Sequence, residues 1–270
     1  MSNSDRRIIF FDIDGTLITD DDEHLFPQDA IDAIRAARAA GHLTFINTGR
    51  SYCNIESWIK AAGFDGYVCG CGSHIMYQGK ELYHKVQPQE TCREIAYKCR
   101  EYGINSIFEY KDWNCYDHEM TLPDMDNLLE YFGRDGKKVI SDIEDKDFIF
   151  DKFSGWYDEN SDVEGFIKYI SQYFDYIDRE GNFCEVEPKG HSKASGIKFI
   201  LDYLGLPLHN AVVFGDGNND LEMLRLVPNS VCMGQGSELA QKTASYITDT
   251  VREGGIANAL RYFGVIQGQC

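Results

Sequence analysis

The fold of this 270-residue chain is decided by the stretch Ile8-Ile9-Phe10-Phe11-Asp12-Ile13-Asp14-Gly15-Thr16. Four apolar residues in a row that give way to polar ones predict a short strand buried on both faces. In an extended segment, residues i and i+2 point the same way. We therefore expect Asp12 and Asp14 to lie on one side of the chain, just beyond this strand.

Two later apolar runs end in the same way. Residues 43–46 lead into Asn47-Thr48-Gly49-Arg50, and residues 211–214 lead into Gly215-Asp216-Gly217-Asn218-Asn219-Asp220. Helically spaced apolar residues lie between such runs, as in residues 30–37. This alternation of strand and helix predicts an α/β fold with a parallel, Rossmann-like sheet between two layers of helices. Further helices are expected over residues 55–62, 193–204, 221–226 and 256–263, and further strands over 67–69, 231–233 and 246–248.

The middle of the chain has a different pattern. Residues 74–77 and 81–86 flank a Gln-Gly-Lys turn like a hairpin. The alternation of aromatic or charged residues with apolar ones that follows is typical of an antiparallel sheet with one solvated face. Helices are expected over residues 89–101 and 162–173, and strands over 104–110, 148–156, 175–179 and 182–186. We interpret residues 83–187 as an α/β cap domain inserted into a core that residues 1–82 and 188–270 form.

Composition excludes several classes of function. The formal net charge of −18 disfavours nucleic acid and anionic membranes as partners. No apolar run reaches the ~18–20 residues that span a bilayer, and no targeting segment is recognisable, which predicts a cytoplasmic protein. Nine cysteines without a secretory signal indicate reduced thiols. Cys69 and Cys71 are better explained as small buried residues than as a metal or redox pair.

The polar segments after the three apolar runs are expected to converge, because ligands bind beyond the carboxyl ends of parallel strands. Asp12, Asp14 and Asp216 would supply hard oxygen donors of the kind that Mg²⁺ prefers. The alternative for Asp12 and Asp14 is a turn with helix-capping carboxylates. Thr48 could cap a helix or donate to a phosphate oxygen. Lys193 opens a predicted helix, where a cation opposes the helix dipole, and this favours a functional role.

These residues resemble the four motifs of the haloacid dehalogenase superfamily, in order and along essentially the whole chain. Asp12-Ile13-Asp14-Gly15-Thr16 is similar to the first motif, Thr48-Gly49-Arg50 to the second and Lys193 to the third. The stretch from Gly215 to Leu224 resembles the fourth motif in the Cof-type phosphatase branch. Two segments depart from that branch: relatives often carry Asn-Gly-Ala and Met-Gly-Asn-Ala where this chain has Cys71-Gly72-Ser73 and Met233-Gly234-Gln235-Gly236.

The resemblance implies roles for individual residues. Asp12 would be the nucleophile that becomes phosphorylated, and Asp14 the general acid and then base. Mg²⁺ would be held by Asp12, the backbone carbonyl of Asp14 and Asp216. The remaining site residues would contact phosphate or position these groups: Thr48, Lys193, Asn219 and Gly49 at the phosphate, Thr16 at Asp14, Asp220 at Lys193 or the metal, and Arg50 at the substrate or in a surface ion pair.

The function expected is that of a Mg²⁺-dependent phosphatase for small phosphorylated molecules, with sugar phosphates first. A phosphomutase with the same phospho-aspartate stays open, as does a non-catalytic binder of phosphorylated ligands, against which the intact residue set argues. A receiver domain lacks the second aspartate and is shorter. Oligomeric state has no signature in the sequence.

Two further features receive structural interpretations. The acidic run Asp20–Glu23 is expected to form a solvated loop rather than a calcium site. Trp113, Trp156 and Tyr157 are expected in the core or on the sheet of the cap rather than as platforms for substrate.

Overall fold

The computed structural model describes residues 6–120, 130, 139–140, 142–179 and 181–267. Contacts divide the chain into two compact units. The first comprises Met1–Gly49, Trp58–Leu82 and Ser192–Cys270, and the second Arg50–Ser57 and Tyr83–His191. The fold class expected from the sequence is confirmed: a mostly parallel sheet with helices, joined to an inserted α/β unit.

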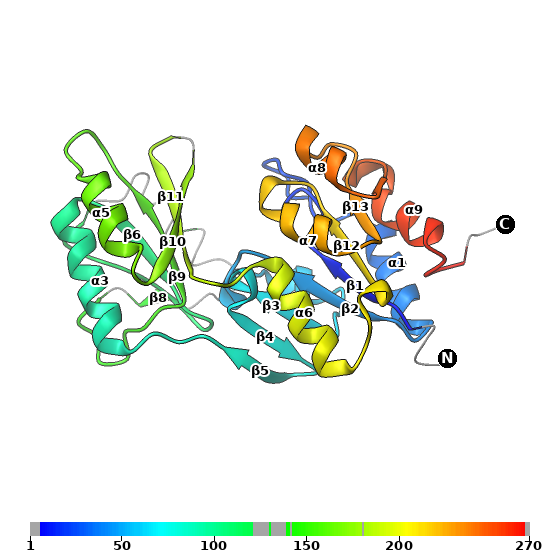
Figure 1. Ribbon diagram of the computed structural model, residues 1–270, viewed down its shortest axis with the longest axis horizontal. Helices are drawn as coiled ribbons and strands as arrows, with labels where there is room; N and C mark the ends of the chain where they lie inside the picture. Colours follow the sequence, from blue (N-terminus) through cyan, green and yellow to red (C-terminus); the bar gives the residue numbers. More distant parts are fainter. Residues whose placement is uncertain (1–5, 121–129, 131–138, 141, 180, 268–270) are drawn as a thin grey trace. The chain divides into compact units, whose positions relative to one another are not determined.

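The first unit is built on an eight-stranded sheet with the order β14-β13-β12-β1-β2-β3-β4-β5 (Figure 1). Its strands are β1 (Ile8–Phe11), β2 (Leu43–Asn47), β3 (Gly66–Cys69), β4 (His74–Tyr77), β5 (Lys80–His84), β12 (Ala211–Gly215), β13 (Ser230–Cys232) and β14 (Tyr246–Ile247). The strands from β14 to β3 pair in parallel, and β4 returns antiparallel to β3. β1 therefore lies between β12 and β2, so the segments that follow these three strands are neighbours.

Helices complete the layers of the first unit. They are α1 (Gln28–Ala39), α2 (Ser57–Lys60), α6 (Lys193–Leu204), α7 (Leu221–Leu226), α8 (Glu238–Thr243) and α9 (Gly255–Tyr262). α6 packs on β3 and α7 on β12, whereas α1 packs on β2 and on α9. Short 3-10 turns are η1 (Tyr52–Asn54), η2 (Gly70–Gly72), η4 (Leu208–Asn210), η5 (Asn218–Asp220) and η6 (Val251–Glu253).

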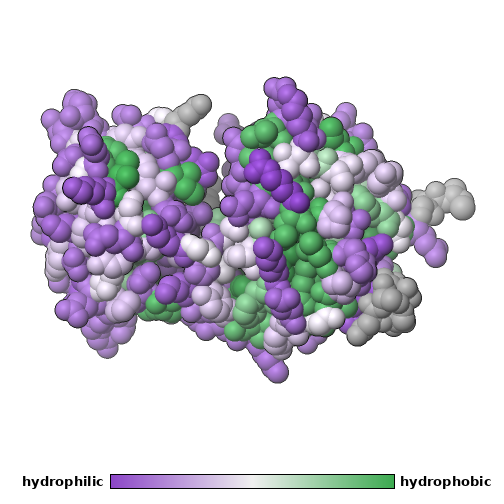
Figure 2. Space-filling view, viewed as in Figure 1, coloured by the Kyte–Doolittle hydropathy of each residue, from purple (hydrophilic) through white to green (hydrophobic). Residues whose placement is uncertain are grey.

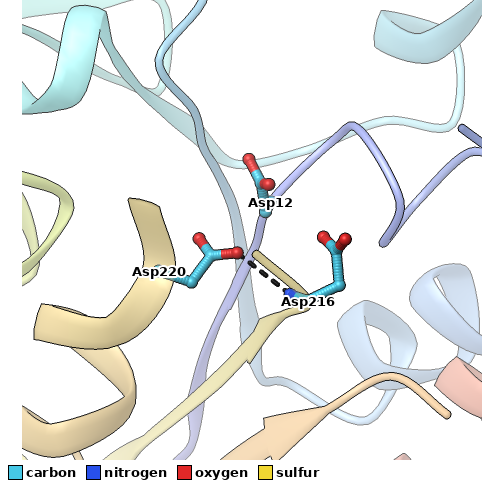
Figure 3. A group of neighbouring side chains, drawn as sticks. All are labelled: Asp12, Asp216 and Asp220. Carbon is cyan, nitrogen blue, oxygen red and sulfur yellow. Dashed lines mark hydrogen bonds between the residues drawn. The ribbon is translucent and has the colours of Figure 1, made fainter. Parts of the chain in front are cut away.

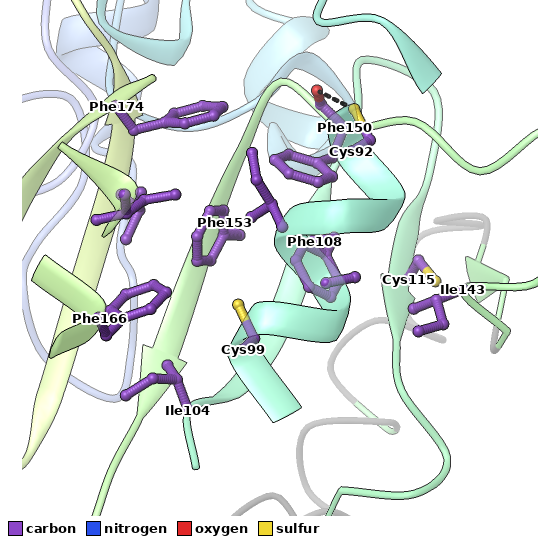
Figure 4. Packing of buried hydrophobic residues seen from close by; sticks show 14 of the residues in the cluster. Cys92, Cys99, Ile104, Phe108, Cys115, Ile143, Phe150, Phe153, Phe166 and Phe174 are labelled. Atoms are coloured by element: carbon purple, nitrogen blue, oxygen red, sulfur yellow. Dashed lines mark hydrogen bonds between the residues drawn. The ribbon is translucent and has the colours of Figure 1, made fainter. Parts of the chain in front are cut away.

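The second unit has a six-stranded sheet with the order β10-β11-β9-β6-β7-β8. Its elements are α3 (Gln89–Tyr102), β6 (Asn105–Glu109), β7 (Asn114–Tyr116), β8 (Val139–Ile140), β9 (Lys152–Trp156), α5 (Val163–Ile170), β10 (Phe174–Arg179) and β11 (Phe183–Pro188). Packing of α3 and α5 on the sheet buries a phenylalanine-rich core that includes Phe108, Phe150, Phe153, Phe166 and Phe174 (Figure 4).

The structure differs from the expected elements of this unit in its strands. β7 and β8 have no counterpart among the four strands expected from the sequence. The sequence predicts a strand over residues 148–156, but the strand begins at Lys152. The carboxylates of Asp142 and Asp145 each accept from the backbone N–H two residues later, at 2.7 and 2.9 Å. These Asx turns bend the backbone ahead of Phe148, so its burial comes from a turn rather than from sheet pairing.

The division into units also differs from the expected boundaries, because residues 50–57 and 188–191 belong to the second unit. Glu109 is buried, and its Oε2 accepts from Ser51 Oγ at 2.7 Å and from Asn54 Nδ2 at 2.8 Å. Asn54 also exchanges hydrogen bonds with Asn114. These contacts fasten the segment that follows Gly49 to β6 and β7.

The eight described cysteines are thiols, and Cys69 and Cys71 are buried, while Cys270 lies outside the described residues. In the acidic run, Asp21 and Glu23 pair with Arg252, at 2.8 and 2.6 Å. In the part of the chain described, no helix has the length and apolarity needed to cross a bilayer.

The three cap aromatics make local contacts within the second unit. Trp156 packs against Phe183, with ring centroids 5.0 Å apart, and Trp113 packs against Tyr110 at 4.4 Å. Tyr157 donates to Asp178 at 2.7 Å.

Candidate active site

Three carboxylates gather at the carboxyl ends of β1 and β12. Asp12 follows β1, Asp216 follows β12, and Asp220 closes the 3-10 turn η5 (Figure 3). One oxygen from each lies within 4.8 Å of the others, and Asp12 and Asp220 are buried. Like charges this close repel unless a cation or proton lies among them. Hard oxygen donors at this spacing fit a Mg²⁺ ion.

Lys193 is the cation that the chain itself supplies. Its Nζ lies 2.7 Å from Asp12 Oδ1 and 2.6 Å from Asp220 Oδ1, and the residue is 2% exposed. Ser192 caps α6 in a capping box, which fixes the helix start and directs this side chain from the first helical position. The cost of placing a cation at a helix N-terminus is offset by these two carboxylates.

Asp220 is held by both of its carboxylate oxygens. Oδ1 accepts from Lys193, and Oδ2 accepts from the backbone N–H groups of Asp216 at 2.9 Å and Gly217 at 3.1 Å. A Cβ at position 215 would lie 2.5 Å from Asp220 Cγ, so Gly215 is needed for this close approach. This geometry favours Asp220 as the residue that orients Lys193 and the Asp216 loop over Asp220 as a direct metal ligand.

Burial and mutual repulsion change the titration of these groups. Burial raises the pKa of Asp12 well above its usual range, and the charge of Lys193 offsets only part of the shift. Burial, and then the charge of Asp220, raises the pKa of Asp216 to about 7. Burial lowers the pKa of Lys193, but the charges of Asp12 and Asp220 more than offset this, so its pKa is raised and the ammonium stays charged.

The turn after Asp12 fits closely around Asp216. Gly15 adopts φ +68°, and a Cβ there would lie 2.3 Å from Asp216 Oδ2. Thr16 is buried and its hydroxyl donates to Asp216 Oδ1 at 3.1 Å, so the structure places Thr16 on Asp216. Asp14 is half-buried, and its charge raises the pKa of Asp12, as expected for a neighbouring carboxylate.

Thr48 follows β2, beside β1, as the strand order requires. It is 1% exposed; its N–H donates to Val68 O at 2.9 Å and its carbonyl accepts from Cys71 N–H at 3.1 Å. Cys71 occupies the left-handed region, with φ +51° and ψ +39°, a conformation that is uncommon for residues other than glycine, asparagine and aspartate. Gly49 is half-buried and is the last residue of the first unit's opening segment.

Two of the site residues expected from the sequence, Arg50 and Asn219, have no contact with the carboxylates or Lys193 among the hydrogen bonds and ion pairs described for them. Arg50 belongs to the second unit, where its Nη1 lies 2.7 Å from Glu56 Oε2 and donates to Asn54 O at 3.2 Å. Asn219 is exposed in η5, beside Gly217. Roles for both in binding substrate stay predictions.

Asn47 is a residue that sequence reasoning missed. It is fully buried at the end of β2, and its Nδ2 donates to Lys193 O at 3.2 Å and contacts Met223 Sδ at 3.5 Å. The amide thereby ties β2 to the helix start that carries Lys193. In the sequence, its role is indicated only by its position, since Asn47 is an amide at the end of a run of mostly apolar residues.

Comparisons with known proteins show the family to which the chain belongs. A family model for haloacid dehalogenase-like hydrolases matches residues 9–260. YkrA of Bacillus subtilis (strain 168), provisionally named a phosphatase, is 26% identical over 268 residues, covering 97% of this chain and 100% of YkrA. From the same organism, the 5-amino-6-(5-phospho-D-ribitylamino)uracil phosphatase YitU is 24% identical over 281 residues, covering 96% and 98%.

Among solved structures, the HAD subclass IIB sugar phosphatase BT4131 superimposes with a TM-score of 0.78 at 28% identity, over 96% of this chain and 100% of that one. A hypothetical protein from Geobacillus kaustophilus HTA426 reaches a TM-score of 0.84 at 26% identity, over 97% and 100%. The chain therefore belongs to the haloacid dehalogenase-like hydrolases, as an enzyme that acts on phosphoric monoester bonds.

Proposed function

We propose that the protein is a Mg²⁺-dependent phosphatase of small-molecule phosphate monoesters, sugar phosphates first among them, that works through phosphorylation of Asp12. The observation that carries the proposal is the bridge that Lys193 forms between Asp12 and Asp220, next to Asp216. A buried nucleophile held by a cation, at the edge of the sheet where ligands bind, is suited to attack a phosphoryl group.

The reaction balances over two displacements. An oxygen of Asp12 attacks phosphorus, and the bond from phosphorus to the leaving oxygen breaks while Asp14 protonates that oxygen. Asp14, now a carboxylate, accepts a proton from water. The water oxygen attacks phosphorus and the bond to Asp12 breaks, which releases inorganic phosphate and restores both aspartates.

Asp12, the backbone carbonyl of Asp14 and Asp216 would hold the Mg²⁺ ion. Bound Mg²⁺ would offset the charge of the phosphoryl group and of the surrounding carboxylates. Lys193 holds the nucleophile, and Asp220 holds Lys193. Thr48, the Gly49 backbone and Asn219 are proposed to donate to phosphoryl oxygens.

The substrate class is proposed from the relatives. BT4131 is named a sugar phosphatase, and the name of YitU specifies a phosphorylated ribityl chain on a uracil. Phosphorylated sugars and sugar alcohols are therefore the first class to test, and phosphorylated cofactors and their precursors the second. The second unit is proposed to set this specificity.

The test is phosphate release from a panel of monoesters with Mg²⁺, beside an Asp12→Asn variant. Release by the native protein that is lost in the variant and with EDTA supports the proposal. Isomerisation of a sugar phosphate without net release would instead identify a mutase. No reaction across the panel by folded, Mg²⁺-supplied protein would contradict the assignment.

A further inference from the structure

The loop between β13 and α8 reaches the turn that follows the nucleophile. Gln235 Nε2 donates to the carbonyl of Gly15, and Gln235 Oε1 accepts from the N–H of Val251 at 3.2 Å. One amide thus joins three segments: the turn after β1, the loop after β13, and η6.

The Gly15 turn also contacts the Asp216 carboxylate. The Cα of Gly15 faces Asp216, since a Cβ would come within 2.3 Å of Oδ2, and Thr16 donates to Oδ1 at 3.1 Å. Within the turn, the N–H groups of residues 16–18 donate to the carbonyl of Ile13, and Gln235 adds a hydrogen bond to the Gly15 carbonyl from outside the turn. Asp14 immediately precedes Gly15, so the direction of its carboxyl depends on how this turn is fixed.

The loop that carries Gln235 is built independently of the Gly15 contact. Gln241 Nε2 donates to the carbonyls of Gly234 at 3.1 Å and Gly236 at 3.0 Å. Ser237 N–H donates to Asp216 O at 2.8 Å, and a Cβ on Gly236 would lie 2.9 Å from that same oxygen. Gln241 thus supports the loop without reaching the nucleophile turn.

Gln235 is exposed as a residue, although both ends of its amide are bound. Solvated hydrogen bonds add little to stability, and fixing a glutamine side chain costs rotamer entropy. What the two contacts provide is geometry, because they connect the turn to two other parts of the first unit. An asparagine at this position would be one methylene shorter, so the contact with the Gly15 carbonyl uses the full length of the glutamine side chain.

We infer that Gln235 is a positioning residue for the reaction: it fixes the Gly15 turn so that Asp14 is placed to protonate the leaving oxygen. The inference rests on the proposed function, since it requires a leaving group that needs a proton.

The test uses the leaving group as the readout. A primary sugar phosphate needs a general acid, whereas p-nitrophenyl phosphate expels a stable phenolate and needs little protonation. kcat/KM reports only the steps up to departure of the leaving group, so it isolates the acid role of Asp14 from its later role as a base. Gln235→Met keeps length and removes both hydrogen bonds; Gln235→Asn is a second, milder variant; Gln241→Met is the matched control.

We expect Gln235→Met to lower kcat/KM for the sugar phosphate about tenfold or more, and for p-nitrophenyl phosphate less than about threefold. Gln241→Met should change the two values by the same factor. In an Asp14→Asn background, Gln235→Met should leave the ratio of kcat/KM for the two substrates unchanged, because Gln235 acts on this ratio only through Asp14.

Equal losses on both substrates in folded Gln235 variants, with native near-ultraviolet circular dichroism, would overturn the inference and leave the phosphatase assignment intact. No loss on either substrate would overturn it as well. Failure of the native protein to hydrolyse both esters would overturn the proposed function, and this inference with it.

Discussion

At the scale of single residues, the candidate active site holds one ammonium group, that of Lys193, among carboxylates. Lys193→Met removes the partner of both Asp12 and Asp220 without changing side-chain length greatly. We expect kcat/KM to fall by about 10²–10³-fold, the range seen when one charged or oxyanion-stabilising donor is removed. Steady-state kinetics measure this. Lys198→Met, an exposed change on the same helix, should leave kcat/KM unchanged; an equal loss there would refute a specific role for Lys193.

A second prediction concerns substitution of Gly15 by alanine, for which the same substitution at Gly79 is the control. Both have positive φ, +68° and +74°, but a Cβ at Gly15 would lie 2.3 Å from Asp216 Oδ2, whereas a Cβ at Gly79 would meet open space. Gly79→Ala should cost about 1–2 kcal/mol of unfolding free energy from backbone strain alone. Gly15→Ala should cost more and should also raise the Mg²⁺ concentration needed for half-maximal activity. Urea unfolding and metal titration measure the two effects; equal costs and an unchanged metal requirement would contradict this packing.

Residues of the candidate site were predictable from the sequence where a charged side chain stands directly at the end of a predicted strand or at the start of a predicted helix. Asp12, Asp216 and Lys193 stand at strand ends or a helix start, and the strand order alone brings them together. Gln235 and Asn47 were not predictable, because each acts by reaching a backbone carbonyl far away in sequence, at Gly15 and Lys193. Nothing in local spacing encodes such a contact.

At the scale of elements, a pH-dependent hydrogen bond joins the residues that precede β1 and β2, Arg7 and His42. His42 precedes β2 and is 5% exposed, and its Nδ1 accepts from the N–H of Arg7 at 3.0 Å, which requires a neutral ring. Burial lowers the pKa of His42, and the charges of Arg7 and Arg6 add to this, while a backbone hydrogen bond with Val265 opposes it. Because the folded pKa lies below the unfolded value of about 6.5, this stabilisation is complete above pH 6.5 and is lost as the pH falls.

As the pH falls below about 6.5, the native protein should therefore lose unfolding free energy more steeply than His42→Asn, which keeps an acceptor but does not titrate. Urea unfolding of both proteins across this range gives the difference. A difference that does not change with pH would show that His42 contributes no linkage.

Element boundaries followed the sequence where helix signals were strong. The expected helices over residues 193–204 and 221–226 match α6 and α7. The strand expected from residue 148 begins later, because aspartate side chains form turns that the alternation of apolar residues does not reveal. Residues 50–57 could not be assigned from sequence either, since their place depends on the distant Glu109.

At the scale of the whole molecule, the net charge of −18 opposes a phosphorylated substrate. Hydrophilic residues cover most of the face shown in Figure 2. Long-range repulsion of a dianion weakens as salt shortens the Debye length, from about 30 Å at 0.01 M to about 8 Å at 0.15 M. With Mg²⁺ saturating, KM for a sugar phosphate should therefore decrease as ionic strength rises through this range. A KM that rises with salt would mean that local cations, rather than overall charge, control encounter.

The insertion of one α/β unit into another was predictable from the change in pattern along the chain, because parallel and antiparallel sheets bury their strands differently. The assignment of residues 50–57 to the second unit was not predictable from the sequence. These residues directly follow Thr48 and Gly49 in the chain.

Phosphorylation of Asp12 is the step on which the proposed mechanism depends most. The most direct measurement is to quench the enzyme in acid during turnover of a sugar phosphate with Mg²⁺, reduce any acyl phosphate with borohydride, and map the product by peptide mass spectrometry. We expect homoserine at position 12 in the native protein and none in Asp12→Asn. Phosphate release at the native rate with no modification at position 12, or with modification at another residue, would contradict a phospho-aspartate at Asp12.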